Sequence, residues 1–399
     1  MEDRSITSTD KKKKSKKRKQ RNKIILFVVE LLLLALLLGA LFVWSKAARI
    51  IEKIDTVSEF EDKTEAGINE DLDSETIEVL TGYTNIALFG LDNRSVGNYD
   101  AGRSDSIMIA SINNKTKEVK IVSVYRDTYL SVGNGKYNKA NTAYSKGGVK
   151  QAVQMLNSNL DLDITEYVCV DWAALIEAID ALGGVEIEVT NAEVKWINEY
   201  VSQMHNEIDA DGTKVKNAGR QILNGAQATG YARIRYTSGD DFKRSSRQRI
   251  VLEAMLNKAK DADLATLIKI CEAVFDDIST TLTLPEIINL AKDVTKYSIK
   301  STTGFPFDMT VQDLSGSGST VIPILLEKNV SKLHAYMFEN EEYNPSFSVK
   351  AISTAIIEKT GVDETYKPIN VDKFNNTAGQ EGTDFHKPEK ETESDEEND

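Results

Sequence analysis

Hydrophobic and polar positions follow two different periods between residues 84 and 189, and the pattern predicts a layered α/β fold. Apolar runs with strand character lie at 84–91, 106–112, 120–124, 167–170 and 185–189. Apolar residues at helical spacing lie between them, at 149–160 and 172–182. Strands that alternate with helices are typical of a sheet covered by helices. We therefore expect an α-β-α domain with a central mixed sheet.

The pattern changes after Gln248, where it is largely helical as far as about Lys300, with Pro285 expected to open one helix. We interpret residues 81–260 as the core of the domain and 261–371 as a helical and C-terminal extension. Residues 372–399 are acidic and poor in aromatic side chains. That composition is typical of a disordered tail.

One apolar run near the N-terminus is long enough to cross a membrane. Residues 24–44 are apolar except for Glu30, and a helix of this length spans about 31 Å, the thickness of a bilayer core. The basic run before it favours a cytoplasmic N-terminus. We expect a cytoplasmic basic tail (1–23), a transmembrane helix (24–44) and an extracellular stalk (45–80). A cleaved signal peptide is the alternative, with a weak cleavage site at Ser45-Lys46-Ala47-Ala48.

Charge separates this basic tail from an acidic body. Residues 1–23 contain eleven Lys or Arg and three acids, which gives this tail a net charge of +8. Because the whole chain has a net charge of −13, the remaining residues carry −21. Nucleic-acid binding depends on neutralising phosphates with Lys and Arg. We therefore expect no nucleic-acid partner.

Cysteine and histidine are scarce. Cys169 and Cys271 both lie in apolar runs, lack Cys-x-x-Cys spacing and are expected to be buried thiols. The chain has three histidines. Chemistry that needs a histidine base or a histidine metal cluster is therefore disfavoured.

Charged residues follow the predicted strands instead. Asp92 follows the first strand, Asp105 opens the second, and Arg126-Asp127 follows the third. Ligands of α/β sheets gather at strand ends, and carboxylates together with phosphate oxygens suit Mg²⁺ or Mn²⁺. Taken alone, the two aspartates are better explained by turn chemistry, and the alternative for Arg126-Asp127 is a local ion pair.

Arginine recurs later in the chain. Arg233 and Arg235 alternate, so in an extended segment both would point to one side. Three further residues follow Asp241 at helical spacing and would share one helix surface: Arg244, Arg247 and Gln248. Because guanidinium groups grip phosphate oxygens in bidentate fashion, these residues favour a phosphorylated ligand.

In this order the residues resemble the LytR-CpsA-Psr family over about residues 84–260. The blocks are Asn85-Ile86-x-Leu88-x-Gly90-x-Asp92-x-Arg94, Arg103-Ser104-Asp105, Ser123-x-x-Arg126-Asp127-Thr128, Lys139-x-Asn141-x-Ala143-Tyr144, Gly147-Gly148, Asp180-x-x-Gly183-Gly184-Val185, Gly219-x-x-x-Leu223-x-Gly225, Ala232-Arg233-x-Arg235 and Asp241-x-x-Arg244-x-x-Arg247-Gln248. Tyr125 departs from the pattern, because the family usually has Pro there. The change should alter backbone stiffness more than charge.

The resemblance implies a single-pass membrane protein of mainly Gram-positive bacteria, with its catalytic domain outside the cell. Such proteins transfer a glycopolymer, of teichoic acid or capsule type, from undecaprenyl pyrophosphate to peptidoglycan, and their domain encloses an apolar pocket for the polyprenyl chain. Matching positions imply Asp92 and Asp105 as ligands of Mg²⁺ or Mn²⁺. The implied pyrophosphate contacts are Arg103, Arg126, Arg233, Arg235, Arg244 and Gln248, with weaker matches at Lys139 and Arg247.

Phosphoryl transfer depends mostly on positioning and on charge stabilisation. We therefore assign charge stabilisation in the transition state to Arg126, Arg233 and Arg235. Asp127 either accepts the proton of the acceptor hydroxyl or forms a structural ion pair. Two other functions stay open: a hydrolase that releases the lipid phosphate to water, and a non-catalytic, membrane-tethered regulator of cell-envelope genes. The clustering of Arg with Asp disfavours the regulator.

Overall fold

The computed structural model describes residues 55–56, 60, 65–92, 99, 102–235, 240–263, 266–267, 270, 278–282, 286, 290 and 293–371. The expected cytoplasmic tail (1–23), transmembrane helix (24–44) and acidic tail (372–399) lie outside these residues, as do Pro285 and Cys271. Within the described ranges, no helix combines the length and the apolar character that crossing a membrane requires.

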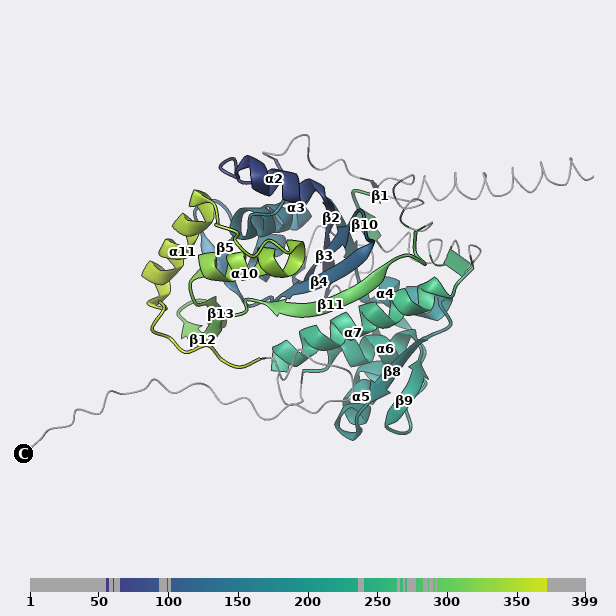
Figure 1. The fold of residues 1–399 in the computed structure, drawn as a ribbon. Helices are drawn as coiled ribbons and strands as arrows, with labels where there is room; N and C mark the ends of the chain where they lie inside the picture. Colours follow the sequence, from purple (N-terminus) through teal and green to yellow (C-terminus); the bar gives the residue numbers. More distant parts are fainter. Residues whose placement is uncertain are drawn as a thin grey trace, which may run out of the picture. The chain divides into compact units, whose positions relative to one another are not determined.

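A seven-stranded sheet forms the centre of the domain, in the order β1-β10-β7-β2-β3-β4-β11 (Figure 1). The strands are β1 (Asp55–Thr56), β2 (Tyr83–Leu91), β3 (Ser104–Asn113), β4 (Glu118–Val124), β7 (Glu166–Val170), β10 (Ile278–Thr280) and β11 (Ser298–Phe305). β7 runs parallel to β2 and β11 parallel to β4, whereas β3 is antiparallel to both β2 and β4. The predicted mixed sheet is therefore confirmed.

One face of the sheet is covered by α3 (Asn141–Leu160), α10 (Leu326–Phe338) and α11 (Phe347–Thr360). Phe89, Ile109 and Val122 point to this face and join the largest apolar cluster of the described residues. They alternate with residues of the opposite face, as expected for strands with a period of two.

The opposite face packs against α7 (Asp240–Lys260). Ile86, Met108 and Ile121 contact this layer, which includes Leu252 and Leu256. Next to it, a separate apolar cluster joins α4 (Trp172–Ala181), α5 (Asn191–Ile208), α6 (Gly225–Arg233) and the hairpin of β8 (Val185–Val189) and β9 (Gly219–Leu223). Helices thus cover both faces.

Three smaller elements complete the described fold. They are the helix α2 (Ser74–Thr81), the hairpin of β5 (Tyr129–Ser131) and β6 (Tyr137–Lys139), and the hairpin of β12 (Met309–Leu314) and β13 (Gly318–Pro323). The folded domain begins earlier than expected, because Ala66 is fully buried and Asn69 donates a hydrogen bond to Asp161 at 2.7 Å. Residues 65–80 are therefore part of the domain and not of a stalk.

The expectation of a largely helical stretch up to Lys300 is correct for α7, which continues to Lys260, and wrong for two later segments. β10 and the start of β11 fall in this stretch, and both join the central sheet. β11 pairs with β4 through partners distant in sequence, such as Thr302 with Ile121. Non-local pairing of this kind outweighs the local pattern.

Candidate active site

Strand direction brings the predicted site residues to one edge of the sheet. β2, β4 and β7 run in the same direction, and β3 begins where they end. Asp92, Arg126 and Trp172 follow the ends of these three strands, and Asp105 lies at the start of β3. Residues far apart in the sequence therefore meet here.

A bulge in β3 directs Asp105. Gly90 pairs with Ser106 and Leu91 with Ser104, which leaves Asp105 without a partner across the strand pair. A bulge of this kind re-aims one side chain and is frequent next to active sites. Gly90 is needed opposite, because a Cβ there would lie 2.9 Å from the Cβ of Ser106.

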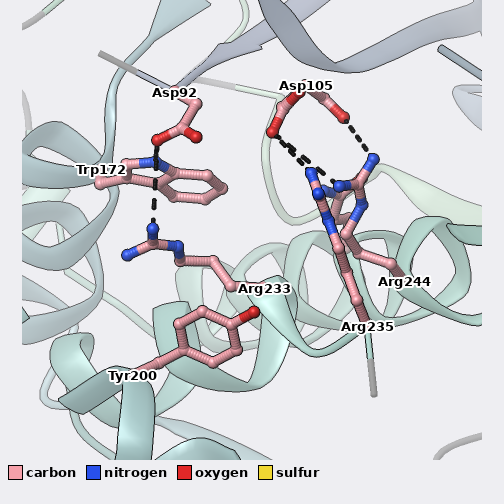
Figure 2. A pocket seen from close by; sticks show the side chains of 8 residues that line it. Asp92, Asp105, Trp172, Tyr200, Arg233, Arg235 and Arg244 are labelled. Atoms are coloured by element: carbon pink, nitrogen blue, oxygen red, sulfur yellow. Dashed lines mark hydrogen bonds and ion pairs between the residues drawn. The ribbon is translucent and has the colours of Figure 1, made fainter. Parts of the chain in front are cut away.

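A cavity of about 110 Å³ opens at this edge and is here called the polar cavity (Figure 2). Its lining consists of Asp92, Asp105, Trp172, Tyr200, Arg233, Arg235, Arg244 and Gln248. The sequence predicted all of these as site residues except Trp172 and Tyr200.

Three arginines converge on the carboxylate of Asp105. Arg126 Nη1 lies 2.6 Å from Oδ1, and Arg235 Nη2 lies 3.0 Å from Oδ2. Arg244 Nη1 is 3.8 Å from Oδ2, and its Nη2 donates to the backbone carbonyl of Asp105 at 3.3 Å. Charge-assisted contacts of this length fix the orientation of the guanidinium groups.

Asp241 holds the same three arginines from the other side. Its carboxylate lies 3.0 Å from Arg126, 3.6 Å from Arg235 and 3.5 Å from Arg244. Burial raises the pKa of Asp241, but the three arginines outweigh burial and lower it. The sequence motif includes Asp241 without indicating this role, since one carboxylate that serves three arginines depends on the fold.

The cluster carries a surplus of positive charge. Burial lowers the pKa of Arg126, but Asp241, Asp105 and Asp127 outweigh burial and raise it. Burial lowers the pKa of Arg244 to about 10, which leaves it protonated at neutral pH. Three guanidinium groups held by the carboxylates of Asp105 and Asp241 favour an additional anion.

Asp127 and Lys139 lie next to this cluster and are not among the residues that line the polar cavity. Asp127 Oδ1 lies 3.1 Å from Lys139 Nζ, and Oδ2 lies 3.5 Å from Arg126 Nε. Burial raises the pKa of the Asp127 carboxyl. This geometry favours the ion-pair interpretation of Asp127 over the general base.

Four predicted phosphate contacts are not among the described residues that line the polar cavity: Arg126 and Lys139, discussed above, and Arg103 and Arg247. Arg103 is exposed, and its backbone carbonyl accepts a hydrogen bond from the Asp92 amide at 3.5 Å. Arg247 is buried, with its Nε donating to Glu193 at 2.8 Å and its Nη1 to the carbonyl of Ile234 at 3.2 Å. Arg247 therefore supports the segment that leads to Arg235, and its position does not support a phosphate contact.

The expectation that Arg233 and Arg235 share one side of an extended segment is wrong. Arg233 is the last residue of α6, and the extended residue Ile234 follows it as the C-cap. Figure 2 shows Arg233 directed to Asp92 and Arg235 to Asp105. The packing of α6, whose residues 225–232 are all buried, outweighs a five-residue alternation.

Arg233 lies between two aromatic rings. Its guanidinium carbon is 5.1 Å from the ring centroid of Trp172 and 4.9 Å from that of Tyr200. The indole Nε1 of Trp172 donates to Asp92 Oδ1 at 3.1 Å. The sequence pattern indicated only an apolar helix position for Trp172, and it predicted no element at 191–208, so both aromatic contacts were missed.

A second cavity of about 220 Å³, here called the apolar cavity, adjoins the first. It is lined by Leu88, Phe89, Gly90, Ser106, Met108, Val168, Val170, Asp171, Trp172, Leu175, Ala232, Gln248, Val251, Leu252 and Met255. Trp172 and Gln248 line both cavities. The expected apolar pocket is therefore present beside the charged groups.

Tyr125, the departure from the family pattern, joins β4 to its neighbours. Its amide donates to the carbonyl of Phe305 at 3.0 Å, a bond that Pro cannot form. Its ring packs edge-on against Phe242 at 4.7 Å, and a Cβ on Gly304 would lie 2.0 Å from its hydroxyl oxygen. Tyr125 thus ties the strand that leads to Arg126 to α7.

The described residues include no group of three or more His, Cys, Asp or Glu that could hold a metal ion by itself. Asp92 and Asp105 nevertheless offer carboxylate oxygens to the same cavity. Mg²⁺ is commonly bound by one or two carboxylates together with substrate phosphates. The donor set therefore fits a divalent cation that shares its ligands with a bound phosphate.

Fold and cavities together define an α/β protein with an arginine-rich anion site open to an apolar cavity. The match to a family model over residues 43–329 shows that the chain belongs to the LytR_cpsA_psr family.

Three similar proteins illustrate this membership. The polyisoprenyl-teichoic acid–peptidoglycan teichoic acid transferase TagU of Enterococcus faecalis is 32% identical over 259 residues, 64% of this chain and 77% of the relative. The corresponding transferase TagV of Bacillus subtilis is 26% identical over 306 residues, 75% of each chain. The crystal structure of protein gbs0355 from Streptococcus agalactiae matches with a TM-score of 0.55 and 25% identity, over 70% of this chain and 93% of that one.

Proposed function

We propose that this protein is a phosphotransferase that attaches a glycopolymer, of teichoic acid or capsule type, from undecaprenyl pyrophosphate to peptidoglycan. Family membership and the names of the relatives support the transfer. The apolar run at 24–44 and the basic run before it support a single-pass anchor in the cell membrane, with a cytoplasmic N-terminus and an extracellular catalytic domain.

The observation that carries the proposal is the junction of the two cavities. The polar cavity presents Arg233, Arg235 and Arg244, and the apolar cavity begins on the other side of Trp172 and Gln248. A pyrophosphate attached to a prenyl chain has the same division into a charged and an apolar part. The two cavities together fit such an amphiphile better than they fit either part alone.

In the proposed reaction, the oxygen of an acceptor hydroxyl attacks the phosphorus on the sugar side of the pyrophosphate. A new P–O bond forms, the P–O bond to the lipid phosphate breaks, and the lipid phosphate leaves with the electron pair. The hydroxyl proton passes to water. Arg126, Arg235 and Arg244, held by Asp105 and Asp241, stabilise the negative charge on the phosphoryl oxygens.

We assign Asp92 and Asp105 to a bound Mg²⁺ or Mn²⁺, on the basis of the donor set described above. The cation would neutralise part of the charge on the pyrophosphate. Both carboxylates are already oriented without it, Asp92 by Trp172 and Asp105 by Arg126 and Arg235. The chain itself therefore keeps the two ligands in place.

The test uses the full-length protein in detergent with a lipid-linked glycopolymer and a peptidoglycan oligosaccharide. Transfer predicts polymer joined to the oligosaccharide, together with free lipid phosphate. We expect Arg126→Ala to lower turnover by about 100-fold, the effect of removing one transition-state charge donor. Arg220→Ala is the matched control, since Arg220 is exposed and paired with Glu186 in the β8–β9 hairpin.

If the polymer is released by hydrolysis although the acceptor is present, the protein is instead a hydrolase. No turnover with any donor would favour the regulator. Normal transfer by Arg126→Ala would remove the role given to that arginine.

A further inference from the structure

Trp172 occupies the boundary between the two cavities, and its backbone is firmly placed. β7 ends at Val170, and Asp171 caps α4 by accepting a hydrogen bond from the Ala174 amide at 3.0 Å. Trp172 is therefore the first residue of α4, and its ring projects from the edge at which the site residues gather (Figure 2). A large side chain at this position can contact a bound ligand and line both cavities.

The two halves of the polar cavity are held in different ways. Around Asp105, Arg126 and Arg235 form ion pairs of 2.6 and 3.0 Å. Arg233 lies 4.0 Å from Asp92 Oδ1, a looser contact, and is stacked between two aromatic rings. Ring stacking, more than a close ion pair, therefore sets the position of Arg233.

Trp172 contacts both charged groups of that looser half, Asp92 and Arg233. Its indole N–H donates to Asp92, its ring faces Arg233, and Trp172 is also one of the residues that line the apolar cavity. Any restriction of the indole therefore restricts both Asp92 and Arg233. Asp105 pairs instead with Arg126 and Arg235, and neither arginine is among the described residues that line the apolar cavity.

We propose that Trp172 is a positioning residue that couples the apolar cavity to the phosphate site: a chain lying in that cavity fixes the indole and thereby orients Asp92 and Arg233. This inference rests on the proposed function for its substrate, a prenyl pyrophosphate. Binding energy of the lipid chain is thereby used to orient the groups around the phosphates, which raises turnover and not affinity alone.

The first experiment measures coupling without any reaction. Calorimetry gives the affinity of the full-length protein for inorganic pyrophosphate, with and without geraniol, a neutral ten-carbon prenyl alcohol, in one detergent. We expect geraniol to tighten pyrophosphate binding about tenfold in the wild type, within the usual range of coupling between two sites. Trp172→Leu should abolish this effect, and Trp172→Phe, which keeps a ring but loses the N–H, should reduce it.

Trp196→Phe is the matched control. It makes the same change on α5 at a residue that is not among the described residues lining either cavity, and it should keep the wild-type coupling. An unchanged pyrophosphate affinity on adding geraniol to the wild type would overturn the proposal. Equal tightening in the wild type and in both Trp172 variants would overturn it as well.

The second experiment separates kcat from KM in the transfer reaction. Trp172→Phe should lower kcat about tenfold with KM within about twofold, because the lost hydrogen bond to a carboxylate orients a group and does not hold the chain. A raised KM with a normal kcat would show that Trp172 contributes only to binding of the lipid chain, and this result would contradict the proposal. Coupling without any transfer would instead contradict the proposed function and leave the role of Trp172 in place.

Discussion

The two faces of the central sheet are built from the same strands, but they differ in how they are packed. On the face covered by α3, the side chains of β2 and β3 join a continuous core, and Asp161 is buried with neutral partners: Tyr343 at 2.8 Å, the Ser346 amide at 2.9 Å and Asn69 at 2.7 Å. On the face covered by α7, two cavities and a group of arginines adjoin the sheet. We call these the closed face and the open face.

The difference separates stability from binding. The closed face gains stability from apolar burial and from hydrogen-bonded buried groups such as Asp161. The open face keeps unfilled space and holds guanidinium groups on buried carboxylates, which is costly unless every charge is paired. Changes to the open face should therefore act mainly on function, and changes to the closed face mainly on stability.

The largest expected effect is that of Asp241→Asn on the open face. This change removes the charge that aligns Arg126, Arg235 and Arg244, and we expect turnover to fall about 100-fold, since a hydrogen bond to a charged group contributes about 1.5–3 kcal/mol. Transfer assays and thermal unfolding on the same preparation measure both quantities. Asp161→Asn on the closed face is the counterpart, and it should lower stability while the folded protein keeps its turnover.

The pH dependence of stability tests the closed face next. Burial lowers the pKa of His334 from 6.5 to about 4. Between these two values the unfolded chain binds a proton that the folded protein does not, so His334 favours folding above pH 6.5 and this stability is lost as the pH falls towards 4. The loss amounts to about 3 kcal/mol at most.

His334→Gln should flatten this part of the profile, as measured by urea unfolding at several pH values between 7.5 and 4. The side chain of Gln can still donate to the carbonyl of Leu160, the present partner of His334. An unchanged slope in the variant would show that other groups cause the acid sensitivity.

The smallest expected effects come from adding volume to either face. Ala152→Leu enlarges a fully packed position on α3 and should cost about 1–3 kcal/mol of stability, with turnover retained. Leu252→Trp fills part of the apolar cavity, so it should change stability by less than about 1 kcal/mol and raise the KM for the lipid donor about tenfold. Equal losses of stability in the two variants would contradict the distinction between the faces.

Much of the fold follows from local patterns. Expected strands at 84–91, 120–124 and 185–189 correspond to β2 (Tyr83–Leu91), β4 (Glu118–Val124) and β8 (Val185–Val189), because one or both faces of each are buried. β10 and β11 were missed, since their pairing with β7 and β4 depends on segments far away in sequence. Periodicity reports burial but not the identity of the neighbour.

The sequence predicted which residues belong to the site better than it predicted how their side chains are oriented. Helical spacing placed Arg244, Arg247 and Gln248 on neighbouring surface, yet only Arg244 and Gln248, four residues apart, line the polar cavity. Arg247 is turned towards Glu193 on α5, an element that the pattern did not reveal. Trp172 was recognised as apolar, but its N–H donor role towards Asp92 required the geometry.

The most direct test is a crystal structure of the protein with Mg²⁺ and geranylgeranyl pyrophosphate. We predict the two phosphates within hydrogen-bonding distance of Arg233, Arg235 and Arg244, and the prenyl chain between Leu88, Val168 and Leu252 in the apolar cavity. A pyrophosphate bound away from these arginines, or a chain lying outside that cavity, would contradict the convergence of the two cavities on one lipid substrate.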